Sequence, residues 1–185
     1  ASNNVAIGYI ALQDNTTGTE NIAIGTGALG ENTTGNENVA VGRSALRLNT
    51  TAIGNTGVGS YALNKVTTGN NNTAVGRDTA DAITTGINNS ALGYLALSAN
   101  TTGSYNVAIG SEAADTNTTG AGNVAIGHQA LETNSTGDYN VAVGYLALES
   151  STATDYNVGV GYRALMNANG ASSCVAIGAF AGDAL

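Results

Sequence analysis

A short apolar block that ends in glycine recurs eleven times along the chain at a constant spacing of 17 residues. The first copy is N-V-A-I-G at residues 4–8 and the last is C-V-A-I-G at residues 174–178, with no insertion or deletion between them. Fixed self-similarity at such a period is typical of solenoid proteins, in which each repeat forms one coil of a continuous array. We therefore expect a single domain over residues 1–185, and we expect it to be a segment of a longer fibre.

Numbered from its asparagine, the repeat reads N-V-A-I-G-x-x-A-L-x-x-N-T-T-G-x-x. The second and fourth positions are mostly Val or Ile and share one face of a strand, whereas the third, on the other face, is Ala nine times and Gly twice. We expect the large side chains to fill the core of the coil. The small residues, such as Ala108, should then lie at a close contact with another chain.

Three further features of the repeat predict how the coil closes. Glycine at the fifth position never varies, which indicates a positive φ or a corner with no room for Cβ. The Ala-Leu pair adds a second apolar segment, and Asn-Thr-Thr-Gly has the composition of a turn around a short β segment. The sequence thus predicts an all-β fold: a parallel β-solenoid or β-roll of eleven coils, forming a rod on the order of 50 Å long at about 4.8 Å per coil.

One coil holds few large apolar side chains for the 17 residues that it orders. We expect a second buried surface between chains, and fibre symmetry makes a homotrimer the favoured assembly. The single cysteine, Cys174, cannot form an intrachain disulfide.

The N-V-A-I-G block, present at Asn4, Asn106 and Asn123, resembles the strand motif of head domains in trimeric autotransporter adhesins. This resemblance implies a trimer of left-handed parallel β-rolls. The adhesin repeats are typically a few residues shorter, and the G-x-x-A-L-x-x-N-T-T-G half is more similar to repeats of bacteriophage tail fibres and other bacterial surface fibres.

The tyrosines provide the candidate ligand site. Tyr145 and Tyr162 share the sixth position and Tyr139 and Tyr156 the seventeenth, so neighbours should stack one coil apart. Aromatic faces bind sugars, and Tyr is common in recognition surfaces. Packing between coils or between chains is the alternative interpretation of the same pattern.

Asn-x-Ser/Thr sequences recur with the repeat and permit two interpretations. They are candidate glycosylation sites, or their amides form a ladder of hydrogen bonds between coils. Those in the Asn-Thr-Thr-Gly segment and its near copies are Asn15, Asn32, Asn49, Asn100, Asn117 and Asn134. The threonines also suggest ice binding, but Thr16 and Thr17 should point to opposite faces and leave one outward row.

Other functions have little support in the sequence. The net charge is −8 and the five basic residues are scattered, which argues against nucleic-acid binding. We find no phosphate loop, metal-ligand spacing or catalytic constellation, and His128 is the only histidine, so we expect no enzyme, cofactor, metal or catalytic site. Nor do we expect membrane insertion in this segment.

These patterns lead to one expected function and one competitor. We expect a structural and adhesive extracellular fibre segment, on a cell surface or a virion, that attaches to a glycan or receptor through its variable positions. The competitor is a purely structural filament or tail-fibre shaft whose subunits make end-to-end contacts with flanking segments.

Overall fold

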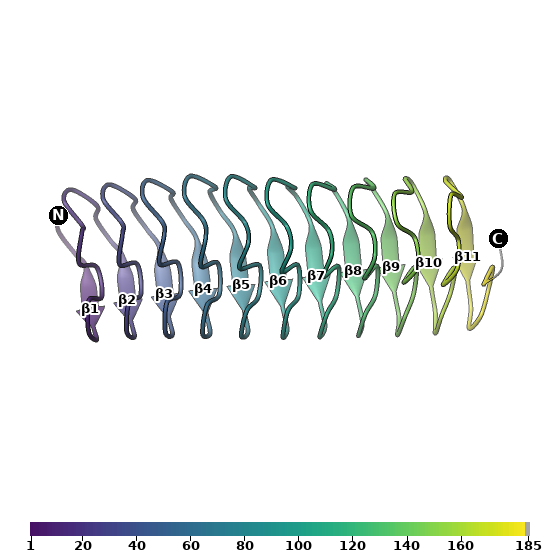
Figure 1. Ribbon diagram of the computed structural model, residues 1–185, viewed down its shortest axis with the longest axis horizontal. Helices are drawn as coiled ribbons and strands as arrows, with labels where there is room; N and C mark the ends of the chain where they lie inside the picture. Colours follow the sequence, from purple (N-terminus) through teal and green to yellow (C-terminus); the bar gives the residue numbers. More distant parts are fainter. Residues whose placement is uncertain (184–185) are drawn as a thin grey trace.

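The computed structural model describes residues 1–183 and forms a straight rod of stacked coils, with the two chain ends at opposite ends of the rod (Figure 1). Each coil contributes one three-residue strand, and the strands form a single parallel sheet in chain order, which confirms the predicted parallel β-solenoid. The strands are β1 Val5–Ile7, β2 Ile22–Ile24, β3 Val39–Val41, β4 Thr56–Val58, β5 Thr73–Val75, β6 Ser90–Leu92, β7 Val107–Ile109, β8 Val124–Ile126, β9 Val141–Val143, β10 Val158–Val160 and β11 Val175–Ile177.

Strand pairing keeps the 17-residue register throughout, so equivalent residues of successive coils lie side by side. Val107 pairs with Ser90 on one side and with Val124 on the other. Each position of the repeat therefore forms a row that runs along the rod.

The two faces of the sheet are the reverse of those predicted. From Ala23 onward the Ala or Gly at the third position is buried, and no Val, Ile or Leu at the second or fourth position is. The small residues point into the coil because the leucine of the Ala-Leu pair already fills it. A Cβ added at Gly57 would lie 3.4 Å from Cγ of Leu46, and at Gly159 it would lie 3.2 Å from Cγ of Leu148. The interior has room for one leucine and two alanine methyl groups at most levels.

The core therefore consists of the two alanine rows and the leucine row. It includes the fully buried Leu29, Leu46, Leu63, Leu97, Leu131, Leu148 and Leu165. Ala108 belongs to this core and not to a contact with another chain, which corrects the prediction for that residue.

The fifth-position glycine meets both of the conditions that its invariance suggests. Gly93 has a φ of +138°, and a Cβ there would lie 2.6 Å from the carbonyl carbon of Gly110 in the next coil. A left-handed backbone also recurs at the seventh, ninth and seventeenth positions, mostly without glycine, for example at Leu146, Leu148 and Tyr139.

Buried asparagines connect the coils. The Oδ1 atom of Asn106 accepts the backbone N–H of Asn123, and its Nδ2 donates to the carbonyl of Gly120 and to Oδ1 of Asn89. The same pattern runs from Asn4 to Asn157 and on to the N–H of Cys174. These bonds satisfy polar groups that the coil buries.

Candidate functional site

The outer face of the sheet is the most distinctive surface of the rod. Its two rows hold the second and fourth residues of every strand, and 19 of these 22 residues are Val, Ile or Leu. Thr56, Thr73 and Ser90 are the polar members. We call this surface the outer sheet face. The strands run from the upper rim of Figure 1 toward its lower edge, so the face has one rim at each end of the strands.

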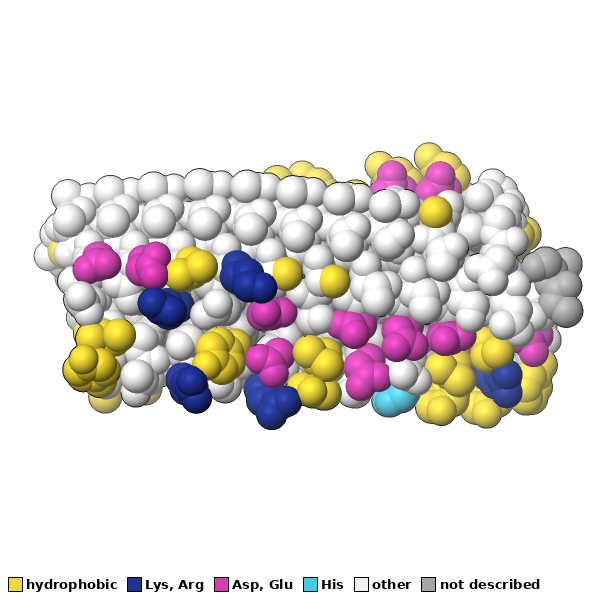
Figure 2. Space-filling view, viewed as in Figure 1, with side chains coloured by type: hydrophobic (Ala, Val, Ile, Leu, Met, Phe, Trp, Pro, Cys, Tyr) yellow, Lys and Arg dark blue, Asp and Glu magenta, His cyan; other side chains and the backbone are white. Residues whose placement is uncertain are grey.

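We define the entry rim as the two residues of each coil that precede its first position, such as Asp138 and Tyr139. The exit rim is the pair that follows the fifth-position glycine, such as Tyr145 and Leu146. Toward the C-terminal end, Figure 2 shows two separate groups of hydrophobic side chains, one on the upper rim beside acidic residues and one along the lower edge.

The four candidate tyrosines divide between these rims and do not form one strip. On the entry rim, Tyr139 and Tyr156 stack with ring centroids 5.4 Å apart. On the exit rim, Tyr145 and Tyr162 stack at 5.4 Å, which continues a stack from His128. All four are exposed, by 46–60% of their surface.

Stacking limits what these rings can bind. A sugar packs on the face of an aromatic ring, but the facing sides of each stacked pair are already covered. The second face of Tyr139 lies over Gly122, since a Cβ there would be 2.7 Å from Cδ1 of the ring, and Tyr162 meets the edge of Phe180. On Tyr139, Tyr145 and Tyr162 the exposed parts are therefore mainly ring edges and hydroxyls. The predicted stacking one coil apart is present, whereas the predicted sugar site stays a prediction.

Arginines accompany the aromatic residues of the exit rim. Arg43 lies over the ring of Tyr61, Arg77 over Tyr94, and the Arg163 guanidinium is 5.6 Å from the centroid of the Phe180 ring. Three of the five basic residues are therefore on this rim. The entry rim instead carries four acids, Glu20, Glu37, Asp138 and Asp155, and within residues 1–183 it carries no Lys or Arg.

The asparagines of the candidate glycosylation sites lie mostly inside the coil. Asn32, Asn49, Asn100, Asn117 and Asn134 are fully buried, and Asn15, in the first coil, is half-buried. Their amides bond within the coil or along the row: Asn32 Nδ2 donates to the carbonyl of Gly35 and to Oδ1 of Asn15. These contacts favour the ladder, and glycosylation of the folded coil would need an exposed amide that these five residues do not offer.

The threonine rows differ in exposure. The hydroxyl of Thr101 donates to the carbonyl of Thr118, and the same bond recurs in most coils, so the row that contains Thr16 is largely used for coil stacking. The neighbouring row, which includes Thr17 and Thr102, is exposed. Ice binding would require two outward rows of threonine, and this surface offers only one.

An acidic row lies on the face seen in Figure 2. It consists of the acids at the tenth position of the repeat, which include Asp81, Asp115, Glu132 and Glu149. Burial is the largest of the effects that raise the pKa of Glu132, and the nearby carboxylates of Glu149, Glu112 and Asp115 raise it further. Gln129 opposes the shift, donating through Nε2 to Oε1 of Glu132 at 3.3 Å. No group of three or more His, Cys, Asp or Glu side chains in the described part of the chain is placed to hold a metal ion.

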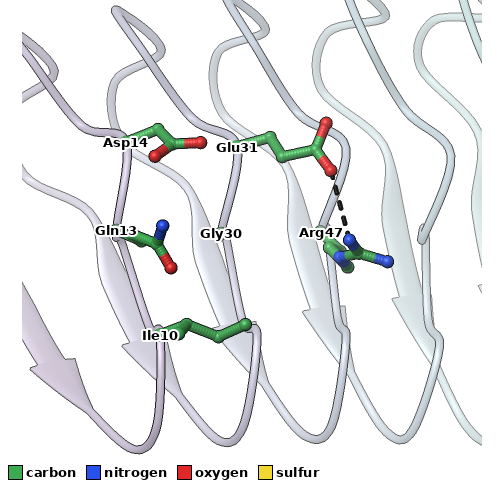
Figure 3. Close-up of a pocket in the computed structure, with 6 residues that line it drawn as sticks. All are labelled: Ile10, Gln13, Asp14, Gly30, Glu31 and Arg47. Carbon is green, nitrogen blue, oxygen red and sulfur yellow. Dashed lines mark ion pairs between the residues drawn. The ribbon is translucent and has the colours of Figure 1, made fainter.

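A small hollow of about 120 Å³ lies between the first three coils (Figure 3). It exists because the second coil has glycine at both the seventh and the tenth positions, Gly27 and Gly30. Glu31 and Arg47 form an exposed ion pair at 3.4 Å on its border. The lining residues are Ile10, Gln13, Asp14, Gly30, Glu31 and Arg47, which include no nucleophile with an adjacent base.

Comparisons with known proteins identify no relative. The chain matches no protein-family model, no curated protein and no solved structure. Among residues 1–183 there is also no helix long and apolar enough to cross a membrane. The surface itself therefore provides the arguments for function.

Proposed function

We propose that the chain is a segment of an extracellular fibre, on a cell surface or a virion, in which three copies assemble around a common axis and present an attachment surface. The observation that carries this proposal is the outer sheet face. The resemblance of the repeat to trimeric adhesin heads and tail fibres supports the fibre and the number three.

The outer sheet face is as large as the largest apolar patch of a typical monomer. Eleven strands at about 4.8 Å, each about 10 Å long, give an apolar strip on the order of 500 Å² in projection. The largest apolar patch on a typical monomer is about 300–600 Å² and is often functional. A parallel sheet is normally covered on both faces. The coil covers one face with its leucines, so a partner must cover the other.

Another copy of the chain fits this face best because every coil repeats the same two apolar rows. Rotation around an axis parallel to the rod places equivalent rows opposite each other at every level. The coil interior then provides one hydrophobic core and the trimer axis a second. This assembly supplies the burial that a single coil lacks.

The proposed mechanism of attachment is avidity. Three chains present the same exposed side chains at the same height, so weak sites act together on a cell-surface glycan or receptor. Exposed side chains vary between coils at positions six, seven, ten and eleven, as adhesion requires. Catalysis, a cofactor and nucleic-acid binding form no part of the proposal. A purely structural filament remains the competing function, and it predicts the same trimer without a ligand.

The assembly is tested by the mass of the protein in solution. We expect the purified chain to sediment as a trimer, and we expect Ile109→Glu with Ile126→Glu, on the outer sheet face, to give folded monomers. The matched control places the same charges on the exposed threonine row of nearby coils, with Thr102→Glu and Thr119→Glu, and should remain trimeric. A monomeric parent, or a trimer that both variants retain, would contradict the proposal.

Attachment requires a separate measurement. Trimers should bind glycan arrays or host-cell surfaces more tightly than the Ile109→Glu, Ile126→Glu monomer by far more than threefold, because avidity multiplies the separate affinities. If a stable trimer binds nothing in such screens, the structural filament is the better description.

A further inference from the structure

We infer that the entry rim of one copy packs in register against the exit rim of the next, so that the stacked tyrosines form a seam between subunits. This inference rests on the proposed assembly and specifies its contact. The partner is a second copy of this chain, placed parallel to the first and at the same height.

Within one chain the two rims cannot meet. Tyr139 precedes β9 by two residues and Tyr145 follows it by two, so about 20 Å of extended chain separates them. The aromatic interactions of each rim run along the rod, from Tyr139 to Tyr156 and from Tyr145 to Tyr162, and none crosses the sheet. If side chains on opposite rims of one coil are complementary in size or charge, that complementarity cannot serve a contact within the chain. It must serve a contact between chains.

Rotational symmetry brings the rims together. When copies surround an axis parallel to the rod with their outer sheet faces inward, the entry rim of each copy lies beside the exit rim of its neighbour. The contact is heterologous, since two different surfaces meet, and a closed ring repeats it at every seam. If the copies are not shifted along the axis, each seventeenth-position residue of one copy faces a sixth-position residue of its neighbour. The residue that it faces has a number higher by six.

The side chains are matched in size at several of these facing positions, above all in the two coils that carry the stacked tyrosines. Tyr139 would face Tyr145, and Tyr156 would face Tyr162, so the two stacked pairs form one cluster at a single height. At two other levels both rims are small, with Gly54 facing Ser60 and Ser173 facing Ala179, whereas Tyr105 would face Ser111 and Gly122 would face His128. Tyr is enriched at protein interfaces, and the exposed ring edges and hydroxyls are the atoms that can pack and hydrogen-bond across the seam.

Charge is matched as well. The entry rim carries four acids and no base in the described residues, whereas the exit rim carries three arginines and two acids, Asp78 and Glu112. The net charges are therefore −4 on one rim and +1 on the other, with His128 neutral. At facing positions, Glu37 would meet Arg43. An antiparallel arrangement of two rods with level ends would instead place the tyrosine cluster of the ninth and tenth coils against the third and second coils, whose rims carry no aromatic ring.

Cysteine crosslinking tests the seam directly. In a Cys174→Asn background, which restores the usual residue of that position, Tyr139→Cys and Tyr145→Cys are combined in one chain and treated with a short bismaleimide. We expect most of the protein to run as a covalent trimer on a denaturing gel. Either substitution alone should give almost none, because equivalent positions of different copies are not neighbours at the seam. Thr136→Cys with Tyr145→Cys is the matched control and should also give almost none.

The outcomes separate the seam from the assembly. A trimer by mass that does not crosslink through Tyr139→Cys and Tyr145→Cys overturns the seam and leaves the trimer standing. Efficient crosslinking only of a shifted pair, such as Tyr139→Cys with Tyr162→Cys, overturns the register. A chain that is monomeric by mass overturns both proposals.

A charge exchange provides a second test without cysteines. Glu37→Arg or Arg43→Glu alone should lower the trimer fraction at low salt, and the double variant should restore it. Because Arg43 also lies over Tyr61 within its own chain, failure of the double variant to recover any trimer would assign Arg43 to that internal contact and contradict its role in the seam.

Discussion

The fifth position of the repeat has a positive φ and has no room for a Cβ atom. Alanine substitution at two glycines distinguishes these two requirements. Gly93→Ala places a Cβ where φ is +138° and where the carbonyl carbon of Gly110 is only 2.6 Å away. Gly27→Ala is the matched control: its φ is +69°, and the nearest atom to its Cβ would be Oγ of Ser44 at 3.7 Å. Other coils place Ser44, Tyr61 or Leu95 at the position of Gly27 with a similar backbone.

The expected free-energy costs differ several-fold. At Gly93, a disfavoured φ costs about 1–3 kcal/mol. The forced separation from the next coil adds about 1–3 kcal/mol, as in an overpacked core. The sum centres near 4 kcal/mol, and for a chain of this length it lowers the Tm by about 8–16 °C. At Gly27 the left-handed φ of +69° costs alanine about 1–2 kcal/mol, and the restriction of the unfolded chain offsets part of this cost, so the net loss should be about 1 kcal/mol.

Thermal unfolding followed by circular dichroism provides the measurement, with all variants at one protein concentration because assembly shifts the apparent stability. Tm values for Gly93→Ala and Gly27→Ala that both equal that of the parent would refute the reasoning, since neither the backbone angle nor the contact between coils would then carry a cost. A loss at Gly27 as large as that at Gly93 would show that the left-handed seventh position, and not the fifth, limits substitution.

Three other substitutions test the interior and the acidic row. Asn106→Ala leaves the N–H of Asn123 without a partner, whereas the carbonyl of Gly120 keeps the hydrogen bond from Nδ2 of Asn117, so urea unfolding should show a loss of about 1–3 kcal/mol. Ala108→Leu should destabilise the coil by about 1–3 kcal/mol through overpacking against the leucine row, and the surviving folded protein should keep its oligomeric mass. Glu132 has a pKa raised above its ordinary value of 4.5, so its ionisation opposes folding: its contribution to stability is present below pH 4.5 and is lost as the pH rises through the higher folded value. Glu132→Gln should therefore raise the Tm at pH 7 relative to the parent and leave it unchanged at pH 3.5, and an equal effect at both pH values would contradict the assignment.

The register of the fold could be predicted because the repeat itself fixes it. Glycine at every fifth position, Asn at nearly every first position and Leu in the Ala-Leu pair each require the same neighbour in the next coil. The orientation of the strand could not be predicted from the same pattern. Alternation shows that Val107 and Ile109 share a face, but it does not show which face is inside. That choice depends on the width of the interior, which a leucine from the other side of the coil already fills.

Backbone angles were the least predictable feature. Leu97, Leu131 and Tyr139 adopt a positive φ, although none belongs to the residue types that usually mark such a turn. The coil imposes this conformation, and glycine appears at these positions only in places such as Gly27 and Gly54. The division of the tyrosines between two rims likewise follows from the position of the strand within the coil. Counting the repeat places equivalent residues in rows but does not say which rows are adjacent.

The hydrogen bonds between coils point along the rod, and this gives the rod a mechanical property. A pulling force applied at opposite ends of the rod loads the ladders of successive coils in series, while all the bonds between any two neighbouring coils share that load. The weakest junction yields first, and one detached coil releases roughly 60 Å of extended chain from its 17 residues. Each such step lowers the tension on the remaining coils, so the rod lengthens in successive steps and dissipates the applied load.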